Sequence, residues 1–218
     1  MKNDKLRPNV LAVRLISNVS PNLSQKLELE SKHKSIGIVT ADIDDVTYTA
    51  LDEATKDADV DVVYARSMYA GSANASTKLA GEVIGIIAGS SPAEVTSGLR
   101  SILNFMKNGS YFVSANEDDS ITYYAYTVSR TGSYLSKVAG IQEGEALAYL
   151  IAPPLEAIYG LDAALKAADV ELKEFYGPPS ETNFGGGLLT GSQSACEAAC
   201  SAFAQAVQTV ADNPKEYE

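Results

Sequence analysis

Residues 51–60 read LDEATKDADV, and residues 161–170 read LDAALKAADV. When Leu51 is aligned with Leu161, the two strings agree at seven of ten positions. A short apolar run precedes each string, at 35–40 and at 146–151, and an apolar run, a long loop, a second apolar run and a Gly-Ser pair follow it. Repetition of this kind is typical of a chain that contains two copies of one structural unit.

The boundary between the copies is expected in the polar, turn-rich segment 107–119. We therefore predict a first repeat over residues 1–112 and a second over residues 113–218. Short apolar and β-branched runs predict strands at residues 9–16, 35–40, 60–66, 82–88, 121–128, 146–151, 170–176 and 186–190. Strands and two helices alternate twice, which predicts an α/β fold of the α+β sandwich type, with helices packed on a sheet.

Each repeat is expected to close with an amphipathic helix, because apolar residues recur at intervals of three and four. The first stripe is Val95, Leu99, Ile102, Leu103 and Met106, and the second is Cys196, Ala199, Cys200, Phe203, Val207 and Val210. Ser90 or Ser91, and Ser192, can cap these helices. The two cysteines are interpreted as small buried apolar side chains rather than as a metal or redox pair.

The composition limits the partners. Of the 218 residues, 45% are hydrophobic, which is enough for a sizeable core, and the formal net charge is −11. This charge repels phosphate groups, so neither nucleic acid nor an anionic membrane is expected as a partner. The first ten residues lack the apolar run of a signal peptide, and no apolar stretch approaches the ~18 residues of a membrane helix. A cytoplasmic location is expected.

Residues for catalysis are not evident. The sole histidine, His33, lies in a polar stretch and is predicted to be an exposed loop residue. Phosphate-loop and dinucleotide motifs are missing, and no Cys/His cluster has metal-ligand spacing. Asp44 and Asp45 suit the positive end of a helix dipole better than a catalytic role. The sequence therefore predicts no enzyme activity, no cofactor and no metal.

Several long strings resemble one family over residues 7–214, nearly the whole chain. They are Thr40–Tyr48 (TADIDDVTY), Ser129–Ser136 (SRTGSYLS), Ala152–Glu156 (APPLE), Pro178–Asn183 (PPSETN) and Leu189–Gln193 (LTGSQ). Together with the repeat, they are similar to the tandem-domain shell proteins of bacterial microcompartments that serve ethanolamine utilisation.

This resemblance implies that each repeat is a circularly permuted microcompartment shell domain. It also implies a homotrimer that mimics a hexagon and makes lateral contacts with other shell tiles. The implied function is structural: a flat tile with small pores in each subunit and a gated central pore for metabolites such as ethanolamine.

Two loops are candidates for the gate. The loop at 66–79 is long for a compact domain, and loops of that length are often lids or binding loops. Its candidate gating residues are Tyr69, Ala70, Gly71 and Ser72. In the matching loop at 177–187, the candidates are Phe184 and Gly185, the latter within a triple-glycine hinge. An ordinary surface loop is the alternative interpretation of both segments.

A pore that selects ethanolamine would bind the ammonium group with carboxylates and the hydroxyl group with an oxygen atom. An aromatic ring could add a cation–π contact with the same ammonium group. The candidate residues at element ends near the loops are Asp44, Asp45, Glu82, Phe112, Thr182 and Asn183.

Two alternatives to a structural tile stay open. The chain could be a regulatory module whose long loops hold ethanolamine or a cofactor, or an enzyme of the same pathway, although no nucleophile–base pair is evident. The segment 129–134 could likewise be a binding turn, but a structural role is favoured.

Overall fold

The computed structural model describes residues 1–67, 79, 81–178 and 183–216. The chain forms two compact units. We call Arg7–Ser110 together with Gly132–Leu135 the N-terminal unit, and Met1–Leu6, Tyr111–Thr131 and Ser136–Glu218 the C-terminal unit. None of the described helices is long and apolar enough to cross a membrane.

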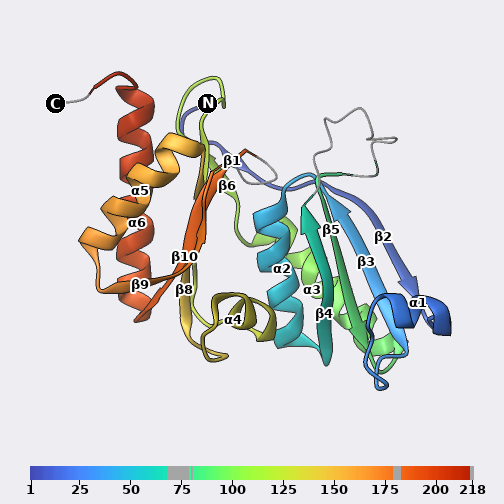
Figure 1. Ribbon diagram of the computed structural model, residues 1–218. Helices are drawn as coiled ribbons and strands as arrows, with labels where there is room; N and C mark the ends of the chain where they lie inside the picture. The colour runs from blue at the N-terminus through green and yellow to red at the C-terminus, as the bar shows by residue number, and fades with distance from the viewer. Residues whose placement is uncertain (68–78, 80, 179–182, 217–218) are drawn as a thin grey trace. The chain divides into compact units, whose positions relative to one another are not determined.

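The N-terminal unit has a four-stranded antiparallel sheet in the order β2-β3-β5-β4. Its strands are β2 (Val10–Ile16), β3 (Ser35–Ala41), β4 (Val60–Ser67) and β5 (Val83–Gly89). Helices α2 (Asp44–Asp57) and α3 (Pro92–Asn108) pack on this sheet, and the short helix α1 (Pro21–Lys26) connects β2 to β3 (Figure 1).

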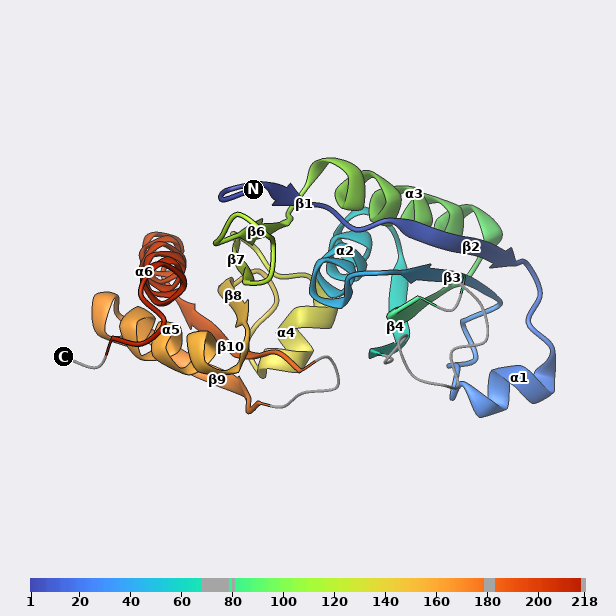
Figure 2. The same ribbon diagram turned by 90° about the horizontal axis from the view of Figure 1, so that it is seen from above.

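The C-terminal unit has a six-stranded antiparallel sheet in the order β1-β6-β7-β8-β10-β9. Its strands are β1 (Lys5–Leu6), β6 (Phe112–Ser114), β7 (Thr122–Val128), β8 (Ala146–Ala152), β9 (Val170–Tyr176) and β10 (Gly185–Gly191). Helices α5 (Pro154–Ala167) and α6 (Gln193–Asp212) lie against this sheet (Figure 2), and α4 (Ser133–Ala139) connects β7 to β8.

The two sheets repeat one topology. Across the sheets, the strand order β2-β3-β5-β4 of one unit corresponds to β7-β8-β10-β9 of the other. Helices α2 and α5 each contain 14 residues, and they begin at Asp44 and Pro154, which keeps the alignment of the repeated string. The predicted repeat and the predicted α+β architecture are confirmed. The boundary between residues 112 and 113 stays a prediction. Two short segments pack with the unit formed by the other part of the chain, 1–6 with the C-terminal unit and 132–135 with the N-terminal unit.

The closing helices bury the predicted stripes with two exceptions, Leu103, which is exposed, and Val210, which is half-buried. Cys196, Cys200, Phe203 and Val207 are buried in one core cluster. In α3 the prediction for Leu103 is wrong, because this side chain is exposed. Both serine caps are confirmed: Ser91 Oγ accepts a hydrogen bond from the Glu94 N–H at 3.2 Å, and Ser192 Oγ accepts one from the Ala195 N–H at 3.2 Å.

The prediction of an exposed His33 is also wrong. The ring is buried, and both of its nitrogens have partners. Nε2 lies 2.8 Å from Asp61 Oδ2, and Nδ1 accepts a hydrogen bond from the Glu30 N–H at 3.2 Å. A polar ring can be buried when its donor and its acceptor both have partners. The polar stretch around His33 in the sequence gave no sign of these partners.

Candidate ligand site and pore residues

Carboxylates gather at the start of α2 in the N-terminal unit. Asp44 and Asp45 are the first two residues of this helix, where the helix dipole favours negative charge. The Asp44 carboxylate accepts hydrogen bonds from the Asp45 N–H at 2.9 Å and from Ser67 Oγ at 2.7 Å. Ser67 in turn hydrogen-bonds the hydroxyl of Tyr48. These bonds hold the Asp44 carboxylate in one orientation.

Glu82 adds a further negative charge to this unit. It precedes β5, its N–H donates to the Ala41 carbonyl at 2.8 Å, and its side chain remains exposed. Partial desolvation raises the pKa of Glu82, and the negative charges of Asp44 and Asp42 raise it further. Carboxylates that repel one another in this way favour the arrival of a cation. Asp44, Asp45 and Glu82 therefore share a unit and a charge that suits an ammonium group, but only Asp44 and Glu82 are at least partly exposed, because Asp45 is buried.

The aromatic candidates lie in the C-terminal unit. Phe112 is buried in β6 and stacks on Tyr124 with a ring-centroid distance of 5.3 Å. Phe184 meets Phe112 edge to face at 6.1 Å. These are favourable geometries for aromatic pairs, so both phenylalanines contribute to packing.

The other candidates divide into described and undescribed residues. Asn183 is exposed and has a φ of 62°, in the left-handed region that asparagine tolerates better than most residues. Thr182 and the four gating candidates in 69–72 lie outside the described residues.

The prediction of a glycine hinge at 185–187 is wrong. Gly185, Gly186 and Gly187 begin strand β10 and pair with Ala152, Ile151 and Leu150 of β8. At Gly186, where φ is 153°, a Cβ atom would clash with the Leu150 carbonyl oxygen. Glycine is therefore needed for close approach of the backbones rather than for hinge motion.

The segment 129–134 has a structural role at its C-terminal end. The backbone N–H groups of Gly132 and Leu135 donate to the two carboxylate oxygens of Asp52 at 2.7 and 2.8 Å. Asp52 is fully buried, so the segment is anchored on α2. This supports the structural interpretation that the sequence favoured over a binding turn.

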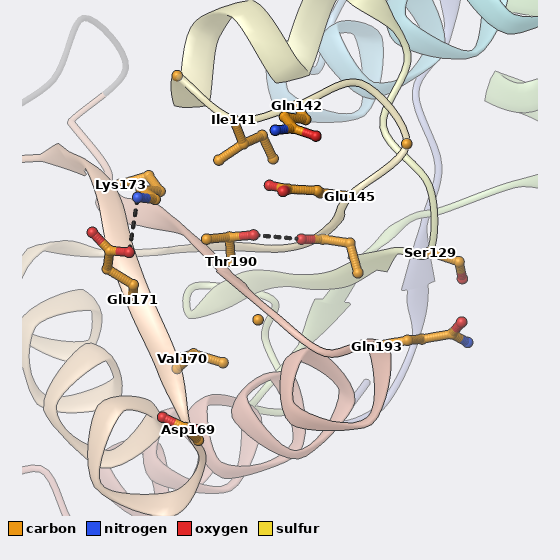
Figure 3. Close-up of a pocket in the computed structure, with 14 residues that line it drawn as sticks. Ser129, Ile141, Gln142, Glu145, Asp169, Val170, Glu171, Lys173, Thr190 and Gln193 are labelled. Atoms are coloured by element: carbon orange, nitrogen blue, oxygen red, sulfur yellow. Dashed lines mark hydrogen bonds and ion pairs between the residues drawn. The ribbon is translucent and has the colours of Figure 1, made fainter.

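An open groove of about 960 Å³ in the C-terminal unit contains none of the predicted site residues (Figure 3). Glu145, Asp169 and Glu171 line it, and Lys173 pairs with Glu171 at 2.8 Å. Its charge suits small polar or cationic molecules rather than anions. The repeat is the signal that could have drawn attention to it, because Glu171 occupies the place in the second copy that Asp61, the partner of His33, occupies in the first.

Comparison with known proteins gives the family. The BMC domain model matches residues 35–117, from β3 to just beyond β6. A protein of Clostridium perfringens (strain 13 / Type A) named bacterial microcompartment shell protein EutL is 76% identical over 98% of this chain and 99% of that protein. The chain belongs to the EutL family of bacterial microcompartment shell proteins. A further EutL, from Escherichia coli K12, is 52% identical over 97% of this chain and 96% of its own length.

The fold agrees with this family. The crystal structure of ethanolamine utilization protein EutL from Leptotrichia buccalis superposes with a TM-score of 0.97 at 69% identity, and the alignment covers 100% of both chains. Both curated relatives are named as bacterial microcompartment shell proteins rather than as enzymes. The family resemblance of the five sequence strings is therefore confirmed.

Proposed function

We propose that this chain is a structural tile in the shell of an ethanolamine-utilisation microcompartment. Three copies form a homotrimer that mimics a hexagon, and trimers make lateral contacts with other shell tiles. The observation that supports this most is the repeat: one chain supplies two units with the same strand order, so three chains supply six similar wedges. Membership in the EutL family supports the location in the shell.

We propose further that small cationic metabolites such as ethanolamine pass through openings in the tile. The loops that contain Tyr69–Ser72 and Phe184 gate the central opening, and carboxylates guide the cation. The net charge of −11 favours cations over anions at any opening. The raised pKa of Glu82 supports a role for the acidic group, because a bound ammonium would relieve its repulsion with Asp44.

The proposed contacts of the bound amine are Asp44, Asp45 and Glu82, and Phe112, Thr182 and Asn183 remain proposed contacts as well. Titration calorimetry with ethanolamine tests the acidic contacts. Asp45→Ala and Glu82→Ala should each weaken binding about tenfold, which is the scale of one lost charge-assisted hydrogen bond. Glu143→Ala, which removes one exposed charge elsewhere, is the matched control and should bind like the parent.

The pH dependence gives a second test of the same contacts. Because the pKa of Glu82 is raised, binding should weaken as the pH falls toward that value, and Glu82→Gln should remove this part of the pH dependence. Unchanged affinity in Asp45→Ala and Glu82→Ala would refute the acidic site. Saturable binding by a chain that stays monomeric would instead favour the regulatory module.

A further inference from the structure

One buried contact in the N-terminal unit joins two segments, and the segments that correspond to them in the other repeat are both exposed. The contact is the anchoring of Gly132–Leu135 on α2. Asp52 accepts hydrogen bonds from the Gly132 and Leu135 N–H groups, and Thr55 Oγ1 accepts one from the Ser133 N–H at 3.1 Å. Lys56 lies 3.7 Å from the Asp52 carboxylate. The carboxylate thus caps the start of α4 from outside that helix.

Helix α5 carries the same anchor at the equivalent position of the repeat. Asp162 corresponds to Asp52 and Lys166 to Lys56, and the two pair at 2.6 Å. Asp52 is fully buried, whereas the Asp162 side chain is 60% exposed. Around Asp162, the same face of α5 presents the exposed apolar side chains Leu155, Ile158, Tyr159 and Leu165. An exposed apolar stripe with a charge at its centre is typical of an interaction surface.

The segment that binds the anchor also has a counterpart. Residues 16–24 read ISNVSPNLS, and residues 128–136 read VSRTGSYLS. When these two strings are aligned, Leu23 in α1 corresponds to Leu135 in α4. Leu135 is 2% exposed, but Leu23 is 39% exposed. The counterpart of the covered segment is thus uncovered.

The two exposed halves fit each other chemically. In the buried contact, the Ser133 N–H donates to the hydroxyl of Thr55. At the counterpart positions, Pro21 has no N–H to donate and Leu165 has no oxygen to accept, so an apolar pair replaces a polar pair. The N–H donor and the hydroxyl acceptor are thus lost together, so burial of this pair would leave no hydrogen-bonding group without a partner.

We propose that the Leu155–Leu165 face of α5 in one copy receives the Ser20–Leu23 turn of α1 from a second copy, with Asp162 as its polar anchor. The two surfaces differ, so the association is heterologous. Such an association forms a closed ring when the rotation from each copy to the next adds up to a full turn. This inference rests on the proposed homotrimer and adds the residues that join its subunits. Ser20 replaces Gly132, at which an added Cβ would clash with Thr55 Oγ1, so the turn sits further from α5 than its counterpart does from α2.

Cross-linking between two variants that each carry one added cysteine tests the contact. The rings of Tyr48 and Tyr134 lie 6.4 Å apart in the buried contact, and their counterparts are Ile158 and Asn22. Asn22→Cys and Ile158→Cys are mixed, allowed to exchange subunits and treated with a short bismaleimide. The native Cys196 and Cys200 are buried and should not react. Mass spectrometry should find the 22–158 linked peptide. A mixture with the exposed Leu103→Cys in place of Ile158→Cys should yield no 22–103 peptide.

Light scattering of charge variants gives a second readout. Leu23→Glu and Ile158→Glu should each shift the mass from the assembled form to the single 23.0 kDa chain, whereas Leu103→Glu should not. This contact would be overturned, and the proposed trimer kept, by three results together. The added cysteines at 22 and 158 would both be modified, no 22–158 peptide would form, and both glutamate variants would keep a trimeric mass. A monomeric parent chain would overturn the proposed trimer and this contact with it.

Discussion

Replacing Asp52 with alanine should cost the folded chain about 3 kcal/mol, because its fully buried carboxylate accepts hydrogen bonds from the N–H groups of Gly132 and Leu135. A hydrogen bond to an ionised group contributes about 1.5–3 kcal/mol, so two such bonds contribute roughly 3–6 kcal/mol. The lower end is expected, because removal also relieves the cost of burying a charge. Lys56 retains its ion pair with Glu53 in the variant.

Urea unfolding followed by circular dichroism measures this loss. Asp52→Asn keeps one carbonyl acceptor and should lose about half as much free energy. Asp162→Ala is the matched control, because its exposed pair with Lys166 should contribute about 0–1 kcal/mol within one chain. Any larger effect of Asp162→Ala should depend on protein concentration, since it would act through assembly. A loss below about 1 kcal/mol for Asp52→Ala would refute the reasoning.

Three other parts of the structure give predictions of their own. Gly186→Ala places a Cβ against the Leu150 carbonyl oxygen, so we expect more than about 3 kcal/mol lost in urea unfolding; a loss under about 1 kcal/mol would contradict the strand geometry. Desolvation favours the neutral form of Asp61, but hydrogen bonds from Lys32 and His33 outweigh it and lower its pKa below the ordinary 3.8. The stability from Asp61 is therefore present above that value and is lost as the pH falls through the lowered pKa, so Asp61→Asn should flatten acid unfolding; an unchanged pH profile would count against this ion pair. Burial raises the pKa of Cys200 to about 11, so Ellman's reagent at pH 8 should label this thiol only after unfolding, and rapid labelling of the folded chain would disprove its burial.

The strands could be predicted because apolar and β-branched runs are local signals. The runs at 60–66 and 170–176 became β4 and β9 with one end residue of difference at most. Strand β6 has three residues and lies in the segment expected as a linker, so no run was long enough to predict it. Helices α1 and α4 were missed for the same reason, since six or seven residues do not establish a helical period.

Burial was harder to predict than secondary structure, because it depends on contacts from distant segments. Asp52 and Asp162 occupy equivalent places in the repeated string, and one is buried while the other is exposed. The difference comes from residues 132–135, which lie far from Asp52 in the chain. His33 is buried for a similar reason, because one of its ring nitrogens hydrogen-bonds with the carboxylate of Asp61, which lies 28 residues away in the chain.

The candidate site was predicted in part. The sequence indicated the helix start at Asp44 and Asp45, and the structure adds Ser67 and the charge of Asp42 to their surroundings. These neighbours come from the end of β4 and from the residue after β3, which no local pattern connects to α2. The triple glycine was misinterpreted as a hinge because glycine serves both flexible loops and closely packed strands.

The native mass of the chain tests the central claim most directly. Light scattering at several protein concentrations should give a discrete species at three times 23.0 kDa, as a tile of three two-repeat chains requires. A chain that stays at 23.0 kDa at every concentration would contradict the account, because a monomer can form neither the ring nor its central opening.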